Sequence, residues 1–110
     1  MKIQRPTDFL IKINEVKSSE GVVLNPLEVY LLFVIRDKFG NEYRAVSDPS
    51  GVDTKNTTIV DGVLYIAVEN YKLVGCLAIS VGIKTIDEHF PDGHCTAYSQ
   101  FKPIAGVELI

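Results

Sequence analysis

Alternation of apolar and polar residues along most of the chain is the feature that most constrains its fold. Residues 8–14 show the pattern clearly, with three apolar side chains on one strand face: Phe9, Ile11 and Ile13. A repeat of two is that of a β-strand whose two faces meet different surroundings, whereas an amphipathic helix repeats every 3.6 residues. The sequence therefore predicts an all-β protein whose first strand covers residues 8–14.

Residues 27–36 form the most apolar segment. Alternate positions give one continuous apolar face: Leu27, Val29, Leu31, Phe33 and Ile35. A helix would also align part of this set, but the many β-branched and aromatic residues favour a strand. Because the opposite face also carries Tyr30, Leu32 and Val34, we expect a central strand buried on much of both sides.

Turn-forming residues predict two hairpins. Gly40 lies in the turn 37–41, after which residues 42–46 return antiparallel to the central strand. The pair Asp61-Gly62 separates residues 57–60 from residues 63–69. A two-residue type I′ turn requires positive φ at both central positions, and Asp-Gly suits it. This pair therefore predicts a tight hairpin.

The connections are less regular. Residues 17–25 are predicted to be a turn or irregular segment, and residues 47–56 a loop or a short edge strand. Residues 70–72 and 87–93 are expected to be turns or loops. Toward the C-terminus, residues 95–101 and 105–110 predict one or two strands separated by Pro103.

A strand over residues 73–84 has two unequal faces. One is apolar, and the other carries small residues: Cys76, Ala78, Ser80 and Gly82. Small residues on one face allow another layer, chain or loop to approach closely. Cysteine at such a position behaves as a small hydrophobe, which is our expectation for Cys76.

Together these segments predict about seven to nine short strands and no helix. That pattern indicates two packed antiparallel sheets or a barrel, and the short, unevenly connected strands favour the sandwich. The length of 110 residues suits one domain, so residues 1–110 are expected to form a single β-sandwich domain.

Charge and hydropathy argue against nucleic-acid binding, a membrane-spanning helix and a signal peptide. The net charge is −3 and the lysines and arginines do not cluster, which argues against a nucleic-acid partner. The longest apolar stretch, residues 73–83, is far shorter than the roughly 20 residues of a membrane-spanning helix. The first nine residues lack a signal-peptide pattern, so synthesis in the cytoplasm is expected unless a signal was removed.

Two cysteines, Cys76 and Cys95, fit either free thiols or a single bridge. They lack the close spacing of zinc or redox motifs, and a reducing cytosol favours free thiols.

One loop gathers residue types that bind metals: Asp87, Glu88, His89, Asp92, His94 and Cys95. Its two histidines are separated by Pro91 and Gly93 in a spacing that matches no established ligand pattern, so a solvated loop is favoured. Cys95 follows His94 directly, and adjacent strand residues point to opposite faces. We therefore predict no catalytic, cofactor or metal site, and no enzyme.

Aromatic residues supply the candidate binding positions. Most lie in strands, where core packing is their ordinary role. Tyr71 and Phe90 fall in predicted turns, and Tyr65 and Tyr98 fall on the less apolar faces of their strands. If exposed, these four residues are candidates for contact with a partner.

Five strings in this order carry a family resemblance: PLEVYLLFVIRDKFGNEYRA (26–45), TTIVDGVLYIAVEN (57–70), LVGCLAISVGI (73–83), DEHFPDGHC (87–95) and GVEL (106–109). They resemble small structural proteins in prophages of gut Bacteroidales. The plan also looks like the N-terminal immunoglobulin-like domain of phage upper-baseplate proteins, in which a strand ending in an Arg-Asp turn precedes a Gly-centred hairpin and a closing strand.

The resemblance implies an immunoglobulin-like β-sandwich and a non-enzymatic phage structural or assembly protein. Its partners would be other tail or baseplate proteins, and it would form a homo-oligomer. Its location would be the host cytoplasm during assembly and then the virion. The alternative is a carbohydrate- or ligand-binding module that uses exposed tyrosines with Asp87, Asp92 and His94.

Overall fold

The computed structural model describes residues 2–3, 8–13, 16–17, 23–69, 73–86 and 88–109. Regular structure in this part of the chain consists of eleven β-strand segments, three of them only two residues long. The strands are β1 (Lys2–Ile3), β2 (Phe9–Ile13), β3 (Val16–Lys17), β4 (Val23–Leu24), β5 (Tyr30–Arg36), β6 (Glu42–Ser47), β7 (Thr57–Val60), β8 (Val63–Val68), β9 (Gly75–Ile86), β10 (His94–Tyr98) and β11 (Lys102–Leu109). The prediction of an all-β protein is confirmed.

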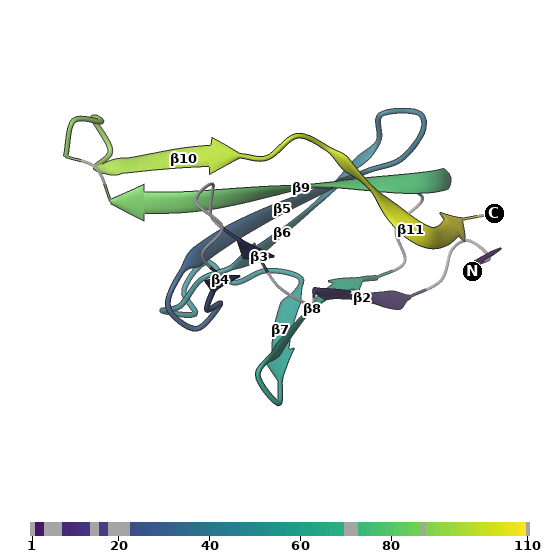
Figure 1. Ribbon diagram of the computed structural model, residues 1–110, viewed down its shortest axis with the longest axis horizontal. Helices are drawn as coiled ribbons and strands as arrows, with labels where there is room; N and C mark the ends of the chain where they lie inside the picture. Colours follow the sequence, from purple (N-terminus) through teal and green to yellow (C-terminus); the bar gives the residue numbers. More distant parts are fainter. Residues whose placement is uncertain are drawn as a thin grey trace.

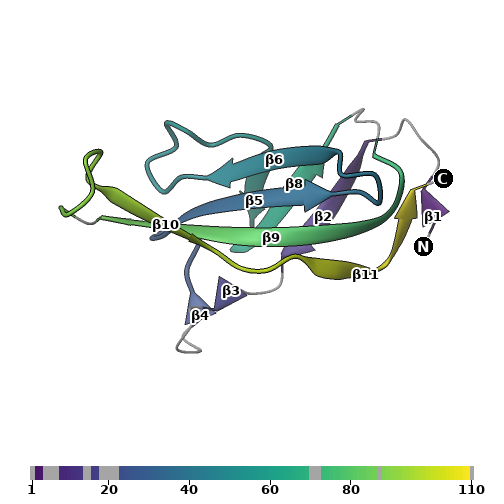
Figure 2. The same cartoon turned by 90° about the horizontal axis from the view of Figure 1, so that it is seen from above.

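The larger sheet is built around β5 and β9. Its strand order is β1-β11-β9-β5-β6, and β10 pairs with β9 beside β11 (Figure 2). All of its pairs are antiparallel except the short parallel pair of β1 with β11. At roughly 3.3 Å per residue, β9 runs about 40 Å. It therefore spans most of the 44 Å long axis of the molecule.

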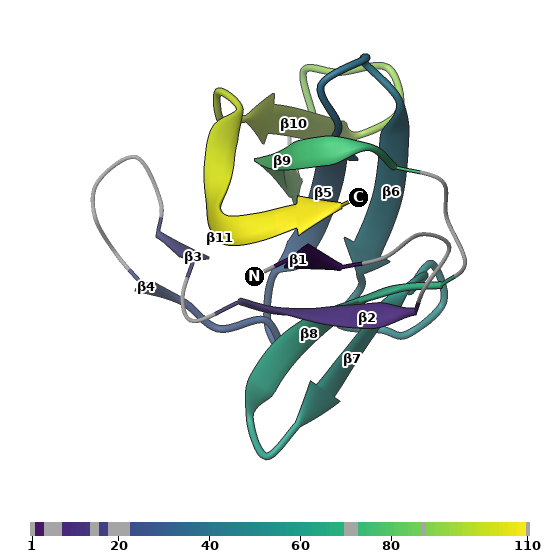
Figure 3. The same cartoon turned by 90° about the vertical axis from the view of Figure 1, so that its right-hand side faces the viewer.

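The smaller sheet has the order β2-β8-β7, and β3 pairs separately with β4. Figures 1 and 3 show this smaller sheet against one face of the larger one, crossing it obliquely. Both sheets contribute to one core: Ile11, Leu31, Phe33, Ile35, Tyr43, Ala45, Leu64, Ile66, Val68, Leu73 and Leu77. Tyr43 on β6 links the layers further, because its hydroxyl donates to the carbonyl of Ala67 on β8 at 2.8 Å.

Several predictions of local structure are confirmed. β5 lies between β9 and β6, and it buries Leu31 and Phe33 on one face and Val34 on the other. Asp61 and Gly62 have φ of 51° and 77° and join β7 to β8, as a type I′ turn requires.

The first part of the central strand was predicted wrongly. Residues 26–28 form a turn, and Leu27 is 61% exposed. The reason is Asn25, whose side-chain oxygen accepts from Leu27 N at 3.0 Å, while its carbonyl accepts from the backbone N–H of Glu28 and Val29. This local bonding holds the chain in a turn until Tyr30 pairs with Lys84.

Three further predictions need correction. Within residues 17–25, Lys17 pairs with Val23 in the two-stranded β3-β4 sheet. Pro103 lies inside β11 and does not end a strand. The sheet tolerates it because Pro103 lies opposite Ala78 at a non-hydrogen-bonded position, so its missing N–H faces away from β9. Cys76, which we expected to behave as a small hydrophobe, is exposed.

Candidate functional site

The two long edges of the larger sheet differ in what covers them. On the β6 side, Val46 exchanges both backbone hydrogen bonds with Lys55, at 2.9 and 3.0 Å. The Thr57 hydroxyl donates to the Val46 carbonyl at 2.6 Å, and the Asn56 amide donates to the Arg44 carbonyl at 3.0 Å. The segment 55–57 therefore closes this edge over the second half of β6.

Among the described residues, β10 pairs with β9 alone, so its other side is open. Ser99 N donates to the Val81 carbonyl at 2.8 Å, just beyond the end of β10. In an antiparallel ladder, hydrogen-bonded and non-bonded positions alternate. Ala97 therefore directs its backbone groups toward β9, whereas Thr96 and Tyr98 direct theirs outward. We call His94–Tyr98, with this outward side, the open edge.

Local chemistry explains how the open edge is formed. Gly93 has φ of 77°, and its N–H donates to the Phe90 carbonyl at 2.9 Å, which closes the loop before β10. His94 N then donates to the Asp92 carboxylate at 3.0 Å. The His94 N–H is therefore bonded within the loop. Thr96 and Tyr98 are the residues of β10 whose N–H and carbonyl both remain available on the open side.

The small residues of β9 hold the Tyr98 ring in place. Tyr98 lies directly opposite Gly82, and a Cβ at Gly82 would lie 2.6 Å from the ring. Ser80 donates from its hydroxyl to the Ser99 carbonyl at 2.7 Å. The Tyr98 side chain, from the neighbouring strand of the same sheet, therefore covers part of this small-residue face.

The inner face of the β9–β10 ribbon is only partly covered, because the ribbon extends beyond the smaller sheet (Figure 1). A groove of about 500 Å³ lies between this face and the β2–β3 segment. It is lined by Lys12, Ile13, Val16, Lys17, Ile79, Val81, Ser99 and Lys102. A second hollow continues it toward Ile83, Ala97 and Tyr98. We call the two together the inner groove.

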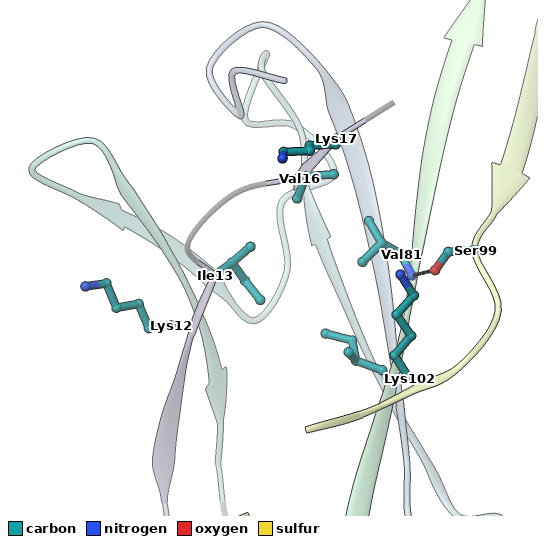
Figure 4. A pocket seen from close by; sticks show the side chains of 8 residues that line it. Lys12, Ile13, Val16, Lys17, Val81, Ser99 and Lys102 are labelled. Atoms are coloured by element: carbon teal, nitrogen blue, oxygen red, sulfur yellow. Dashed lines mark hydrogen bonds between the residues drawn. The ribbon is translucent and has the colours of Figure 1, made fainter. Parts of the chain in front are cut away.

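Figure 4 shows how the side chains of the inner groove lie. Ile13 and Val16 stand on one side and Val81 on the other, so the walls are apolar. Lys102 extends along the β9 side, whereas the ammonium group of Lys12 points away from the groove. Apolar walls with lysines at the rim suit a protein segment better than a reaction centre, which needs converging polar groups.

A polar groove lies on the opposite face, near the start of β5. It has a volume of about 570 Å³ and is lined by Glu28, Val29, Tyr30, Asp48, Pro49, Asp53, Lys84, Thr85, Ile86 and His94. The Tyr30 hydroxyl donates to Asp53 at 3.0 Å, and Lys84 Nζ lies 4.7 Å from the centre of the Tyr30 ring. Burial, the hydrogen bond to Asp53 and the nearby carboxylates raise the pKa of Tyr30. The phenol therefore stays neutral at physiological pH.

The structure separates the aromatic residues proposed from sequence. Tyr65 lies on β8 in the smaller sheet, on the face opposite Leu64 and Ile66, and Tyr98 lies on the larger sheet. Phe90 is 45% exposed in the loop between β9 and β10. Tyr71 falls outside the described residues. Tyr98 is the last residue of the open edge and Phe90 lies in the loop before it, whereas Tyr65 belongs to a different surface.

The loop before β10 also holds the residue types that can bind metals, for which a solvated loop was the favoured interpretation. Asp87 falls outside the described residues, and among the others searched no three histidine, cysteine or acidic side chains converge. Cys95 pairs with Thr85, about 30 Å along β9 from Cys76 at roughly 3.3 Å per residue. Because a disulfide needs Cα atoms within about 7 Å, both thiols are free.

The sequence did not identify two residues of the candidate site, Thr96 on the open edge and Lys102 in the inner groove. Thr96 lies in a predicted strand, but its outward backbone depends on which strand lacks a second neighbour. Lys102 reaches the inner groove from a part of the chain remote from Lys12. Neither the open edge nor the groove leaves a local pattern in the sequence.

Comparison with protein-family models, with curated proteins and with solved structures finds no match to this chain. In the part of the chain that the structure describes, there is also no helix with the length and apolar character needed to cross a membrane.

Proposed function

We propose that the chain is a non-enzymatic assembly module that docks on neighbouring protein subunits by strand addition at the open edge. The observation that carries this proposal is the outward direction of the backbone groups of Thr96 and Tyr98, in a sheet whose other long edge is closed. An exposed edge is a template for another strand: backbone hydrogen bonds supply affinity and alternate side chains supply specificity.

The finer fold that we propose is an immunoglobulin-like β-sandwich, and the order of the strands supports it. The chain changes sheet between β1 and β2, β2 and β5, β6 and β7, and β8 and β9. In immunoglobulin-like domains, one sheet carries the third, sixth and seventh main strands and the other carries the second, fourth and fifth. Here β5, β9 and the β10–β11 edge would correspond to the first group, and β2, β7 and β8 to the second.

The setting we propose for this module is the tail or baseplate of a phage, as the sequence resemblance implies. Its partners would then be other tail proteins and further copies of itself, in the host cytoplasm during assembly and later in the virion. Mass spectrometry of purified particles tests this setting. The chain should be present in a fixed copy number per particle, and its absence from intact particles would exclude a virion role.

Docking at the open edge has its own test. Thr96→Pro removes an outward N–H without removing a hydrogen bond to β9, so the domain should fold while incorporation into particles falls. Thr96→Val is the matched control, because it keeps the backbone groups and changes only the side chain. Equal incorporation of both variants would contradict docking through this edge.

The polar groove favours a second candidate, a carbohydrate-binding module. It brings His94, a residue proposed for that role from sequence, close to Tyr30 and the carboxylate of Asp53. The observation is weaker, because the Tyr30 ring and hydroxyl are already engaged by Lys84 and Asp53. A glycan array tests this candidate. Binding that His94→Ala abolishes would support it, and no binding to any glycan would remove it.

A further inference from the structure

We infer that the strand added to the open edge is β10 of a second copy, antiparallel, with the two-fold axis passing beside Ala97. This inference rests on the proposed docking at the open edge and names the partner. It follows from the hydrogen bonds that the edge offers, from its lack of charge and from the state of the other strand edges.

The available backbone groups determine the register. Thr96 and Tyr98 each offer an N–H and a carbonyl, whereas the His94 N–H is held by Asp92. A two-fold axis at Ala97 places Thr96 opposite Tyr98 of the second copy, and Tyr98 opposite its Thr96. Every outward donor and acceptor of both residues is then paired. An axis at Thr96 would instead place Tyr98 opposite His94, whose N–H is already used.

The side chains of β10 are compatible with pairing to themselves. The strand reads His-Cys-Thr-Ala-Tyr, without lysine, arginine, aspartate, glutamate or proline. Edge strands that avoid association usually carry such residues, lysine above all. At the proposed axis Ala97 would meet Ala97 on the inner face, and Thr96 would lie beside Tyr98 on the outer face. Threonine and aromatic residues are favourable cross-strand neighbours.

The other described edges are less suited to this association. β6 is closed by the segment 55–57. β11 contains Pro103 and an interrupted register. β2 carries exposed Lys12, which would repel its own copy across a two-fold axis. On β7, Thr57 is engaged with β6. Of these strands, β10 presents the edge that fits a second copy best.

Pairing through β10 would also join the two inner grooves. Ala97 lines the extension of the groove, and it would lie at the axis between the two copies. Two partly covered apolar faces would then form one surface across a continuous sheet.

Disulfide trapping tests both the partner and the register. Cys76→Ser and Cys95→Ser first remove the native thiols, and Ala97→Cys then places one thiol beside the proposed axis. Residues directly opposite at a non-hydrogen-bonded position have Cα atoms about 4.5 Å apart, within the range of a disulfide. Mild oxidation should give a covalent dimer. The exposure of Ala97 makes the substitution easy to accommodate.

Thr96→Cys in the same background is the matched control. In the proposed register the two residues at position 96 are displaced along the strands, roughly 8 Å apart, beyond the reach of a disulfide. At least tenfold faster dimer formation by Ala97→Cys than by Thr96→Cys supports the inference. Equal rates, or a faster rate for Thr96→Cys, would overturn it.

Sedimentation of the unmodified chain supplies a second, independent readout. The wild-type chain should dimerise as its concentration rises, and Thr96→Pro should raise the dissociation constant about tenfold or more, since each copy loses a hydrogen bond. A monomer at millimolar concentration would overturn the self-pairing. If Thr96→Pro still blocked incorporation into particles, strand addition would stand with a different protein as partner.

Discussion

The two long edges of the larger sheet show how one chain can close one side of a sheet and leave the other open. At β6, a backbone pair with Lys55 and two side-chain hydrogen bonds from Asn56 and Thr57 occupy the outward groups of Val46 and the carbonyl of Arg44. At β10, the outward groups of Thr96 and Tyr98 have no neighbouring strand in the described part of the chain. Because edge pairing is a general route to association, this contrast is the basis for proposing that the molecule docks through β10.

Both edges depend on the shared core, so disrupting the core should have the largest effect. Phe33 is 1% exposed at the centre of β5, and Phe33→Ala should lower the free energy of unfolding by about 3–5 kcal/mol. Phe39→Ala is the control. Because Phe39 is 69% exposed, this substitution should lower the free energy of unfolding by less than about 0.5 kcal/mol. Urea unfolding measures both variants, and similar losses would contradict the assignment of the core.

Asp37 supports the turn that places β6 beside β5. Its carboxylate accepts from Phe39 N, Asn41 N, the Asn41 amide and Val74 N, at 2.8 to 3.0 Å. Asp37→Asn should lower the free energy of unfolding by about 2–3 kcal/mol at pH 7, because the amide has a donor in place of one accepting oxygen. The loss should be measured by urea unfolding against Asp48→Asn, whose carboxylate serves an exposed turn.

The contribution of Asp37 to the free energy of unfolding should depend on pH. Burial alone would raise the pKa of Asp37, but the hydrogen bonds from Asn41, Phe39 and Val74 outweigh it and hold the pKa below its ordinary value of 3.8. A carboxyl with a lowered folded pKa stabilises the protein above its unfolded pKa, and this stabilisation is lost as the pH falls through the folded pKa. The difference between wild type and Asp37→Asn should therefore narrow below about pH 4. A constant difference down to pH 2 would contradict this role.

The open edge depends on the fit between Tyr98 and Gly82. Gly82→Ala would place a Cβ 2.6 Å from the Tyr98 ring, so the ring must move, at a cost of about 1–2 kcal/mol. In a Tyr98→Ala background the same substitution should cost much less, because the obstacle is gone. A double-mutant cycle by urea unfolding measures this coupling. Additive effects would show that the ring and the glycine are independent.

The smallest expected effect lies at the closed edge. Thr57→Val removes the hydroxyl that donates to the Val46 carbonyl at 2.6 Å, and should cost about 1 kcal/mol. The same change at the exposed neighbour Thr58 is the control. If Thr57→Val lowers the free energy of unfolding no more than Thr58→Val does, this hydrogen bond does not help to close β6.

Local chemistry made much of the fold predictable from sequence. Alternation identified the buried faces of β2, β5 and β8, and the pair Asp61-Gly62 identified the β7–β8 hairpin. These features depend on a few consecutive residues. Leu27 shows the limit, because its alternation is that of a strand, whereas hydrogen bonds to Asn25 hold it in a turn.

The candidate site was less predictable because it depends on pairings between distant segments. Tyr98 could be named as an aromatic on a less apolar face, but its fit on Gly82 follows from the register of β10 with β9. The closed edge needs Lys55 opposite Val46, and the inner groove needs Ile13 and Val16 to face Val81 from a distant part of the chain. Such proximities arise only when the sheets assemble.

Residue-resolved amide hydrogen exchange at increasing protein concentration tests the open edge most directly. The amides of Thr96 and Tyr98 should exchange quickly in dilute solution and become protected as the concentration rises. The amides of Ala97 and Val46, already bonded within the sheet, should change little. Concentration-independent exchange at Thr96 and Tyr98, or new protection along β6 in their place, would contradict the assignment of β10 as the edge where the molecule associates.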